Sequence, residues 1–309
     1  MNLSYFIARR ISREQREGFS STIHKIAVVS IGIGLAASIV AFLILKGFQE
    51  TVQNKIYGFS GHLSITRFTM SNSPEETPMD YNIEIYKNYR QFPYVSHIQE
   101  YAHKAGLIKT DEDILGVILK GVGKSFDTTA FNENIREGHF INLPDSGYSN
   151  QVVLSKTIAG KLMAKVGDDI IIHFFQDPPR SRKLKVSGIY ETNLSEYFDS
   201  RVIIGDVRLI QRLNNWADSI AGGLEVFVTD INKIDKAAEA IGTHIDYDLD
   251  IQRISDRYIQ VFEWLHLLSR QVNILLVVIL VVVCVNMISI ILILVMERTQ
   301  MIGMLKALG

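Results

Sequence analysis

The pattern of hydrophobic and polar positions is dominated by two long segments without a charged residue. Residues 26–45 (IAVVSIGIGLAASIVAFLIL) form the first and residues 272–296 the second. An α-helix of about twenty residues crosses the roughly 30 Å hydrocarbon core of a bilayer. The pattern therefore predicts transmembrane helices at residues 26–45 and 271–296; a pair of buried core helices is the alternative. The first segment is too long for a signal peptide and no small-residue cleavage site follows it.

Flanking charges predict the orientation of these helices. More Lys and Arg residues precede the first span than follow it: Arg9, Arg10, Arg13, Arg16 and Lys25, against Lys46 and Lys55. Cytoplasmic flanks are enriched in basic residues, so the N-terminus is expected in the cytoplasm and residues 46–270 outside it. Residues 1–25 place apolar side chains on one helical face, which predicts an amphipathic helix on the cytoplasmic membrane surface. A solvated basic tail is the alternative.

The region between the spans alternates between strand and helix patterns, which predicts an α/β (α+β) extracytoplasmic domain. The expected strands are 62–68, 95–110, 114–121, 151–154, 169–175, 183–190, 201–204 and 224–229. The expected helices are 81–90, 156–165, 206–213 and 232–241. Helical periodicity also continues from the first span to a C-cap at Gly58, and a helix from about Gln252 leads into the second span. Both spans are therefore expected to project as helical stalks that carry the domain.

The composition argues against nucleic-acid binding, disulfide bonds, metal binding and catalysis. The formal net charge is −1, so no overall basic field favours nucleic acid. The single cysteine, Cys284, lies in the second span, so the outer domain is expected to contain no disulfide bond. The eight histidines show no metal-ligand spacing, and His97 and His103 fit an ordinary strand surface. No Ser/His/Asp or Cys/His pattern indicates a catalytic centre, so the chain is not expected to be an enzyme.

Three short motifs resemble ligand-binding loops but lack essential residues. The segment 121–125 (GVGKS) resembles the end of a phosphate-binding P-loop, yet Ile118 occupies the position of its leading glycine. The segment 32–37 (GIGLAA) resembles a dinucleotide fingerprint but lies within a predicted span. Asp246, Asp248 and Asp250 begin like a calcium loop whose turn glycine and last ligand are missing, so we expect a solvated acidic loop.

Small and polar residues within the spans predict helix packing. Gly32 and Ala36 suit close approach of two helices in the first span. Asn273 and Asn286 are amides at membrane depth in the second, where exposure to lipid is costly. All four are expected to face partner helices; a role of the two amides in transport is the alternative.

The last segment, 297–309 (ERTQMIGMLKALG), contains the most specific signal. Its apolar residues Met301, Met304, Leu305 and Leu308 share one face of a short helix that ends at Gly309. Such a helix at the cytoplasmic surface either lies on lipid or docks into a groove of another protein. The segment resembles the coupling helix of MacB/FtsX-type ABC permeases, and within these it is most similar to the lipoprotein-releasing LolC/LolE family. By this resemblance the residues that couple to an ATPase are Glu297, Arg298, Met301, Ile302, Gly303, Met304, Leu305, Lys306, Leu308 and Gly309.

The resemblance extends over most of the chain. The segments that carry it, in the family's order, are YFIARR, the first span, GHLSI, ILKGV, EGHFINL, QVVLSKTIAGKLMAKVGDDI and KLKVSGIYET. Family members have two further spans after the coupling helix, whereas this sequence stops at Gly309, so we expect a fragment or a truncated product. No ATP-binding domain precedes the first span, so ATP is expected to bind to a separate partner subunit and the chain itself to need no cofactor.

The resemblance implies a transmembrane permease subunit of a type VII ABC complex in the bacterial inner membrane. Its outer part would be a periplasmic domain of the MacB-like core type, with a strand-rich portion formed by both ends and an α/β portion between about 80 and 225. The implied partners are a cytoplasmic ABC ATPase, a second permease subunit in a homo- or heterodimer, a lipoprotein substrate and a periplasmic carrier. The alternatives are an FtsX-like regulator that activates a cell-wall hydrolase, and a membrane-anchored binding module that works without ATP.

Overall fold

The computed structural model describes residues 19–71, 73–109 and 114–307. The amphipathic helix expected in residues 1–25 lies mostly outside these residues. Residues 19–25, which are described, form the beginning of the first long helix.

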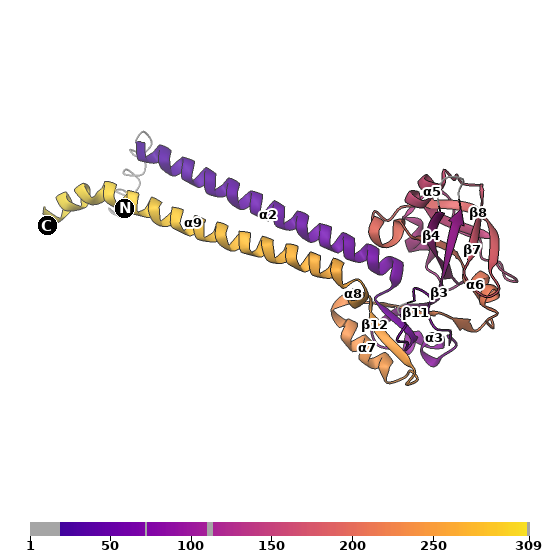
Figure 1. Ribbon diagram of the computed structural model, residues 1–309. Coiled ribbons are helices and arrows are strands. Elements are labelled where there is room, and N and C mark those ends of the chain that lie inside the picture. Colours follow the sequence, from indigo (N-terminus) through magenta and orange to yellow (C-terminus); the bar gives the residue numbers. More distant parts are fainter. Residues whose placement is uncertain (1–18, 72, 110–113, 308–309) are drawn as a thin grey trace. The chain divides into compact units, whose positions relative to one another are not determined.

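The chain divides into two units. A helical unit contains residues 1–52 and 260–309, and a sheet unit contains residues 53–259. The long helices α2 (Phe19–Ser60) and α9 (Ile259–Ala307) provide the helical unit (Figure 1). The two long helices predicted from the uncharged segments are therefore confirmed, while the membrane boundaries at 26–45 and 271–296 stay predictions.

The end of α2 lies two residues beyond Gly58, the expected C-cap. Gly58 is still helical, and the helix ends at Ser60. Gly61 follows with φ +72°, and its N–H donates to the carbonyl oxygen of Tyr57 at 2.8 Å. The left-handed conformation suits glycine because it has no Cβ. The expectation for Gly58 was therefore wrong, and Gly61 ends the helix.

The approach to α9 also differs from the expected continuous helix. Gln252 belongs to strand β12 (Leu249–Arg253), which pairs antiparallel with β1 (Leu63–Arg67) and places Ile251 opposite Ile65. A single helical turn, α8 (Ile254–Arg257), follows, and Tyr258 interrupts the helix before α9 begins. The acidic segment was expected to be a loop; its second half is instead an edge strand, because pairing with β1 uses its backbone groups.

The sheet unit contains a ten-stranded mixed sheet and a two-stranded sheet. The larger sheet has the order β12-β1-β11-β3-β4-β9-β6-β8-β5, and β7 pairs with β3 and β8. Its remaining strands are β3 (Val95–Lys109), β4 (Ile114–Val122), β5 (Ile135–Gly138), β6 (Gln151–Ser155), β7 (Asp169–Phe174), β8 (Arg180–Tyr190), β9 (Val202–Asp206) and β11 (Gly223–Val228). The smaller sheet pairs β2 (Met79–Asp80) with β10 (Ile220–Ala221). The helices are α3 (Glu84–Lys87), η2 (Tyr89–Gln91), α4 (Thr128–Asn132), α5 (Lys156–Leu162), η3 (Ser195–Asp199), α6 (Val207–Asn214), η4 (Ile231–Lys233) and α7 (Ile234–Gly242).

Every strand expected from the sequence is present, with ends displaced by up to three residues. The helix expected over 81–90 is wrong in part, because only α3 and η2 form there. Ile83 provides no side-chain cap, and Asn88 leaves the helical conformation at φ −120° and ψ 27°. By contrast, α5 and α6 begin where expected, since Ser155 Oγ accepts from the Ile158 N–H and the Asp206 carboxylate accepts from the Arg208 N–H.

Two hydrophobic cores share the large sheet. One joins both ends of the sheet unit, from Leu63 to Ile98 and from Leu224 to Ile241, and includes α7. The other lies between Ala102 and Leu213, under α5 and α6. The two expected portions are therefore present, but residues 79–98 pack with the chain ends, so the boundary lies near residue 100 and not near 80.

The half-buried ring of His62 is expected to make the stability of the sheet unit sensitive to acid. The His62 ring stacks on Tyr57 with centroids 4.5 Å apart, and its Nδ1 accepts from the Val228 N–H at 3.2 Å. Burial lowers the pKa of His62 to about 4 from its ordinary value of 6.5. The unfolded chain therefore binds this proton first, so the stabilising contribution is complete above pH 6.5 and is lost as the pH falls toward 4. We expect a loss of at most about 3 kcal/mol, because solvent partly reaches the ring.

Urea unfolding of the full chain between pH 7.5 and 4.5 measures this loss. In the His62→Gln variant, the free energy of unfolding is expected to depend less on pH between pH 6.5 and 4.5. An equal slope in the variant and the wild type would show that another group is responsible.

Candidate functional site

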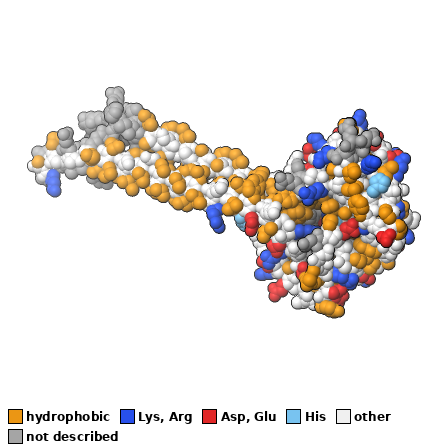
Figure 2. Space-filling view, in the orientation of Figure 1, with side chains coloured by type: hydrophobic (Ala, Val, Ile, Leu, Met, Phe, Trp, Pro, Cys, Tyr) orange, Lys and Arg blue, Asp and Glu red, His pale blue; other side chains and the backbone are white. Residues whose placement is uncertain are grey.

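The helical unit exposes apolar side chains along both of its long helices. By length and composition, residues 25–60 and 259–293 each qualify as a candidate membrane span. Exposed residues include Val29, Ile33, Ile274 and Leu280, each more than half accessible. Figure 2 shows hydrophobic side chains over much of the visible surface of this unit. Exposing so continuous an apolar surface to water is unfavourable, whereas contact with lipid or with partner helices removes that cost.

A polar clasp joins α2 to α9 within the helical unit. Gln49 Nε2 donates to the Leu265 carbonyl oxygen at 2.7 Å and also to Ser269 Oγ. One residue earlier on each helix, the rings of Phe48 and Trp264 meet edge to face with centroids 5.8 Å apart. Because the amide of Gln49 bonds a backbone carbonyl and a side chain of α9, the clasp fixes the register of the two helices at this level.

The predicted packing positions lie on exposed surface in this chain. A Cβ added at Gly32 would meet nothing within 4 Å, and Ala36, Asn273 and Asn286 are exposed. These four residues are therefore not brought together by the described part of the chain. Their packing against helices of another subunit stays a prediction.

The predicted ATPase-coupling segment is the last part of α9. The helix continues without interruption from Ile259 to Ala307, so Glu297, Arg298, Met301, Ile302, Gly303, Met304, Leu305 and Lys306 are all helical. Met304 is 65 % exposed, and a Cβ at Gly303 would meet nothing within 4 Å. Leu308 and Gly309 lie outside the described residues. The segment is thus not a separate short helix within the described range, but an extension of the helix that includes the second candidate span.

A buried ion pair in the sheet unit contacts the last turn of α2. Lys120 on β4 and Glu225 on β11 are joined by a 2.7 Å Nζ–Oε1 contact, with 2 % and 3 % of their side chains exposed. The Lys120 ammonium also donates to the carbonyl oxygen of Phe59 and lies 4.6 Å from the centre of its ring. Gln99 Nε2 donates to the second carboxylate oxygen of Glu225 at 2.8 Å. One buried cation thereby binds a helix C-terminus, where the dipole favours positive charge, to two sheet strands.

A second charged cluster surrounds the turn before α9. Glu76 accepts from the His103 N–H at 2.9 Å and contacts His103 Nδ1 at 2.6 Å and Arg257 at 3.7 Å. Burial opposes ionisation of Glu76, but His103 and Arg257 outweigh it and hold the pKa of Glu76 below its ordinary value. This cluster links the turn α8 to strand β3. His103 is therefore part of an ion-pair cluster, not of an ordinary strand surface as expected.

The segment 121–125 is structural at each of its glycines. A Cβ at Gly121 would lie 2.7 Å from the Val207 Cα, and one at Gly123 would lie 1.6 Å from Glu100 Oε1. Lys124 forms an ion pair with Asp145. These close approaches explain the glycines by packing, in agreement with the rejection of a P-loop.

The acidic segment near β12 carries no cluster of ligands. Asp248 pairs with Arg67 at 2.9 Å. Among the residues that the structure describes, no group of three or more His, Cys, Asp or Glu side chains could hold a metal ion.

Comparison with known proteins identifies one family model and several curated relatives. The model of the MacB-like periplasmic core domain matches residues 26–244. The lipoprotein-releasing system transmembrane protein LolC of Buchnera aphidicola is 26 % identical over 235 residues, which cover 71 % of this chain and 55 % of that protein. LolC of Neisseria meningitidis is 22 % identical over 315 residues, covering 97 % of this chain and 72 % of that protein. LolE of Haemophilus influenzae is 26 % identical over 176 residues, covering 56 % and 41 %. The match thus spans about half the length of several curated relatives.

Two solved structures of extracytoplasmic regions align with this chain. The extracellular domain of the ABC-type transporter YknZ aligns at 13 % identity and a TM-score of 0.42, covering 62 % of this chain and 99 % of that one. The periplasmic region of MacB from Actinobacillus actinomycetemcomitans aligns at 15 % identity and a TM-score of 0.44, covering 69 % and 98 %.

Proposed function

Because the chain belongs to the family of MacB-like periplasmic core domains, we propose that it is the membrane permease subunit of an ATP-driven ABC complex. In this proposal the complex is of type VII: ATP is hydrolysed by a cytoplasmic partner and the permease transmits the resulting movement to the periplasm. The similarity to LolC and LolE supports release of lipoproteins from the inner membrane to a periplasmic carrier as the work performed.

The observation that carries the proposal is the unbroken course of α9. One helix includes the segment that resembles the coupling helix, at residues 297–307, and the second candidate span. A continuous helix transmits displacement along its axis, because its backbone hydrogen bonds resist bending and stretching. A flexible linker at the same place would absorb the movement.

Contacts within each unit support transmission further. In the helical unit the Gln49 clasp joins α2 to α9, so displacement of one helix acts on the other. In the sheet unit Lys120 binds the last turn of α2, and Glu76 binds Arg257 on the turn that precedes α9. The last turn of α2 is thus attached to the central strands by a buried charge, and the turn α8 by a partly exposed one.

The exposed polar groups of the helical unit support packing against helices of a partner subunit. Asn273 and Asn286 lie on exposed surface of α9 at the depth predicted for lipid. An unpaired amide there is costly, so we propose that both face helices of a second permease subunit. Gly32 and Ala36 would accept a close helix on the surface of α2 in the same way.

Proteoliposomes provide the direct test of this function. The chain, co-purified with its ATPase partner, is reconstituted with a fluorescent lipoprotein, and ATP-dependent transfer of the lipoprotein to a soluble fraction is measured. The expected result is transfer with ATP and none with a non-hydrolysable analogue. Nucleotide-dependent stimulation of a cell-wall hydrolase without lipoprotein transfer would identify the FtsX-like alternative.

Membrane orientation gives a separate prediction. If the basic N-terminal residues orient the first span, the loop around Pro144 is periplasmic. A reporter enzyme active only in the periplasm is expected to be active when inserted at Pro144 and inactive when fused to the N-terminus. The reverse pattern would contradict the assignment.

A further inference from the structure

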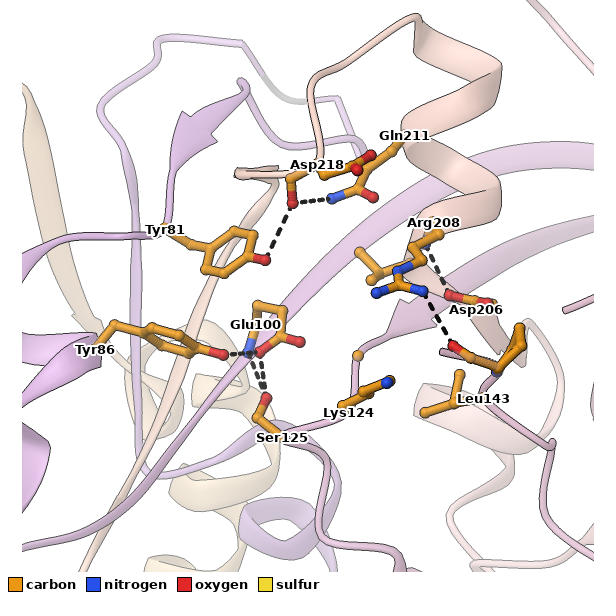
Figure 3. Close-up of a pocket in the computed structure, with 13 residues that line it drawn as sticks. Tyr81, Tyr86, Glu100, Lys124, Ser125, Leu143, Asp206, Arg208, Gln211 and Asp218 are labelled. Atoms are coloured by element: carbon orange, nitrogen blue, oxygen red, sulfur yellow. Dashed lines mark hydrogen bonds between the residues drawn. The ribbon is translucent and has the colours of Figure 1, made fainter. Parts of the chain in front are cut away.

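The sheet unit contains a pocket of about 230 Å³ that the proposed transport mechanism does not use (Figure 3). Its walls come from Tyr81 after β2, from α3, from the interior of β3, from the loops after β4 and before β6, from the first turns of α6 and from the loop before β10. These segments are distant in sequence, and the fold brings their polar side chains around one cavity.

One wall presents a buried carboxylate without a cation. Glu100 is 5 % exposed, and its Oε2 accepts from the Tyr86 hydroxyl at 2.6 Å and from Ser125 Oγ. Among the described residues, none forms an ion pair with it, and no hydrogen-bond donor reaches its Oε1. Gly123 leaves room for that oxygen, since a Cβ there would lie 1.6 Å from it. Burying a carboxylate is costly unless it is paired, so this group favours a cationic ligand.

Elsewhere along the cavity lies the buried side-chain amide of Gln211. Gln211 is 2 % exposed, and its Nε2 donates to the carbonyl oxygens of Asp218 at 3.1 Å and Ile220 at 2.8 Å. These two bonds fix the amide, and Oε1 is left buried without a partner in the described part of the chain. This oxygen exposes less than 1 Å², so it lies behind the pocket wall and Glu100 is the acceptor that a ligand reaches.

The remaining walls contain two tyrosine rings and the guanidinium of Arg208, which could bind a negative group of a ligand. Tyr81 and Tyr86 meet edge to face with centroids 5.1 Å apart, and such rings favour a neighbouring cation. Arg208 Nη1 donates to the carbonyl oxygens of Pro144 at 3.0 Å and of two further loop residues, which holds the guanidinium at the cavity. Figure 3 shows its other terminal nitrogen directed into the pocket, where no described residue bonds it. Lys124 also lines the pocket, but its ammonium is paired with Asp145. The pocket thus presents the carboxylate of Glu100 on one side and the free end of the Arg208 guanidinium on another.

We propose that this pocket binds a basic amino-acid residue, lysine or arginine, through both of its charged ends. The side-chain cation contacts Glu100 beside the tyrosines, and the carboxylate or a peptide carbonyl accepts from Arg208. The volume of about 230 Å³ corresponds to the space of about eight waters, which suits a single residue and excludes a folded partner. A free amino acid and a residue within a peptide share this chemistry. The proposal is independent of the ATP-driven function.

Calorimetric titration of the purified full chain in detergent tests the ligand class. The probes are L-lysine, L-arginine, L-norleucine and the tripeptides Gly-Lys-Gly and Gly-Nle-Gly. Saturable binding of a basic probe, at least about tenfold tighter than its norleucine counterpart, is expected. A tripeptide that binds more tightly than free lysine identifies a peptide source, and the reverse identifies the free amino acid. Absent binding of every basic probe, or equal binding of norleucine, would overturn the proposal.

A matched pair of variants tests the site. Glu100→Gln keeps the shape and the hydroxyl contacts but removes the charge, and it is expected to weaken the basic probe at least about tenfold. Glu239→Gln removes a charge from the exposed surface of α7 and is expected to leave binding unchanged. Thermal unfolding of both variants checks that they fold, and the norleucine comparison in the wild type stands without them. Unchanged affinity in a folded Glu100→Gln would refute the assigned role of the carboxylate.

Discussion

Leu305→Asp is expected to abolish recovery of the proposed ATPase partner with this chain. Met301, Met304, Leu305 and Leu308 follow one another at helical spacing, and α9 is helical through Ala307. If this face docks into a groove of the ATPase, each buried side chain contributes roughly 1.5–3 kcal/mol. The substitution removes that contribution and also buries a carboxylate without a partner, so association is expected to weaken by orders of magnitude.

Thr299→Asp is the matched control for this prediction. It introduces the same charge one and a half turns earlier, about half a turn around the helix from the apolar face, at an exposed position. We expect this variant to co-purify with the ATPase and to stimulate it normally. If Leu305→Asp also retained the ATPase and released lipoprotein at the wild-type rate, the segment would rest on lipid and the coupling assignment would be wrong.

The long apolar segments and the buried strands could be predicted because their signals are local. A run of about twenty uncharged residues has few alternatives to a spanning helix, and β-branched runs such as 151–154 suit few structures other than a strand. Strand β12 and the short helix α4 escaped prediction. Their sequences, LDIQR and TTAFN, are too short to show a clear period, and they form because a neighbouring strand or the Asp127 cap satisfies their backbone.

The charged contacts inside the sheet unit could not be placed from the sequence. Lys120, Glu225 and Glu100 each stand in a strand pattern whose polar positions normally face water. Here they are buried because other elements pack over them. Lys120 and Glu225 contact each other although they are 105 positions apart, and Glu100 contacts Tyr86 and Ser125. A charge within an otherwise apolar strand, as in ILKGV and GLEVFV, is the signal that could have marked them.

The glycines of the segment 121–125 illustrate the same limit. The sequence alone shows that the leading glycine of a P-loop is missing, and this suffices to reject that motif. It does not show why the glycines are there. The reason is tertiary: Gly121 lets α6 approach β4, and Gly123 makes room for the carboxylate of Glu100.

Lys120→Met is expected to destabilise the sheet unit by roughly 3–5 kcal/mol. The substitution leaves the Glu225 carboxylate buried with only Gln99 as a donor, and an uncompensated buried charge is far more costly than a lost surface contact. Lys156→Met is the matched control, because Lys156 pairs with Glu191 while 64 % of its side chain is exposed. A loss within about 1 kcal/mol is expected there. Urea unfolding of the full chain, followed by Trp216 fluorescence in a Trp264→Phe background, measures both; equal losses would contradict the buried-charge argument.

The double variant Lys120→Met/Glu225→Gln separates stability from transmission. Replacing both members of a buried pair with neutral residues is often close to neutral for folding, so most of the lost stability is expected to return. The Phe59 carbonyl oxygen at the end of α2 still loses its cationic donor. If the ion pair attaches the helix to the sheet for transmission, the double variant is expected to fold and to retain the ATPase, yet to release lipoprotein more slowly per ATP hydrolysed. Wild-type release by a stably folded double variant would restrict the ion pair to a structural role and leave the clasp at Gln49 and the Glu76–Arg257 contact as the remaining candidates for transmission.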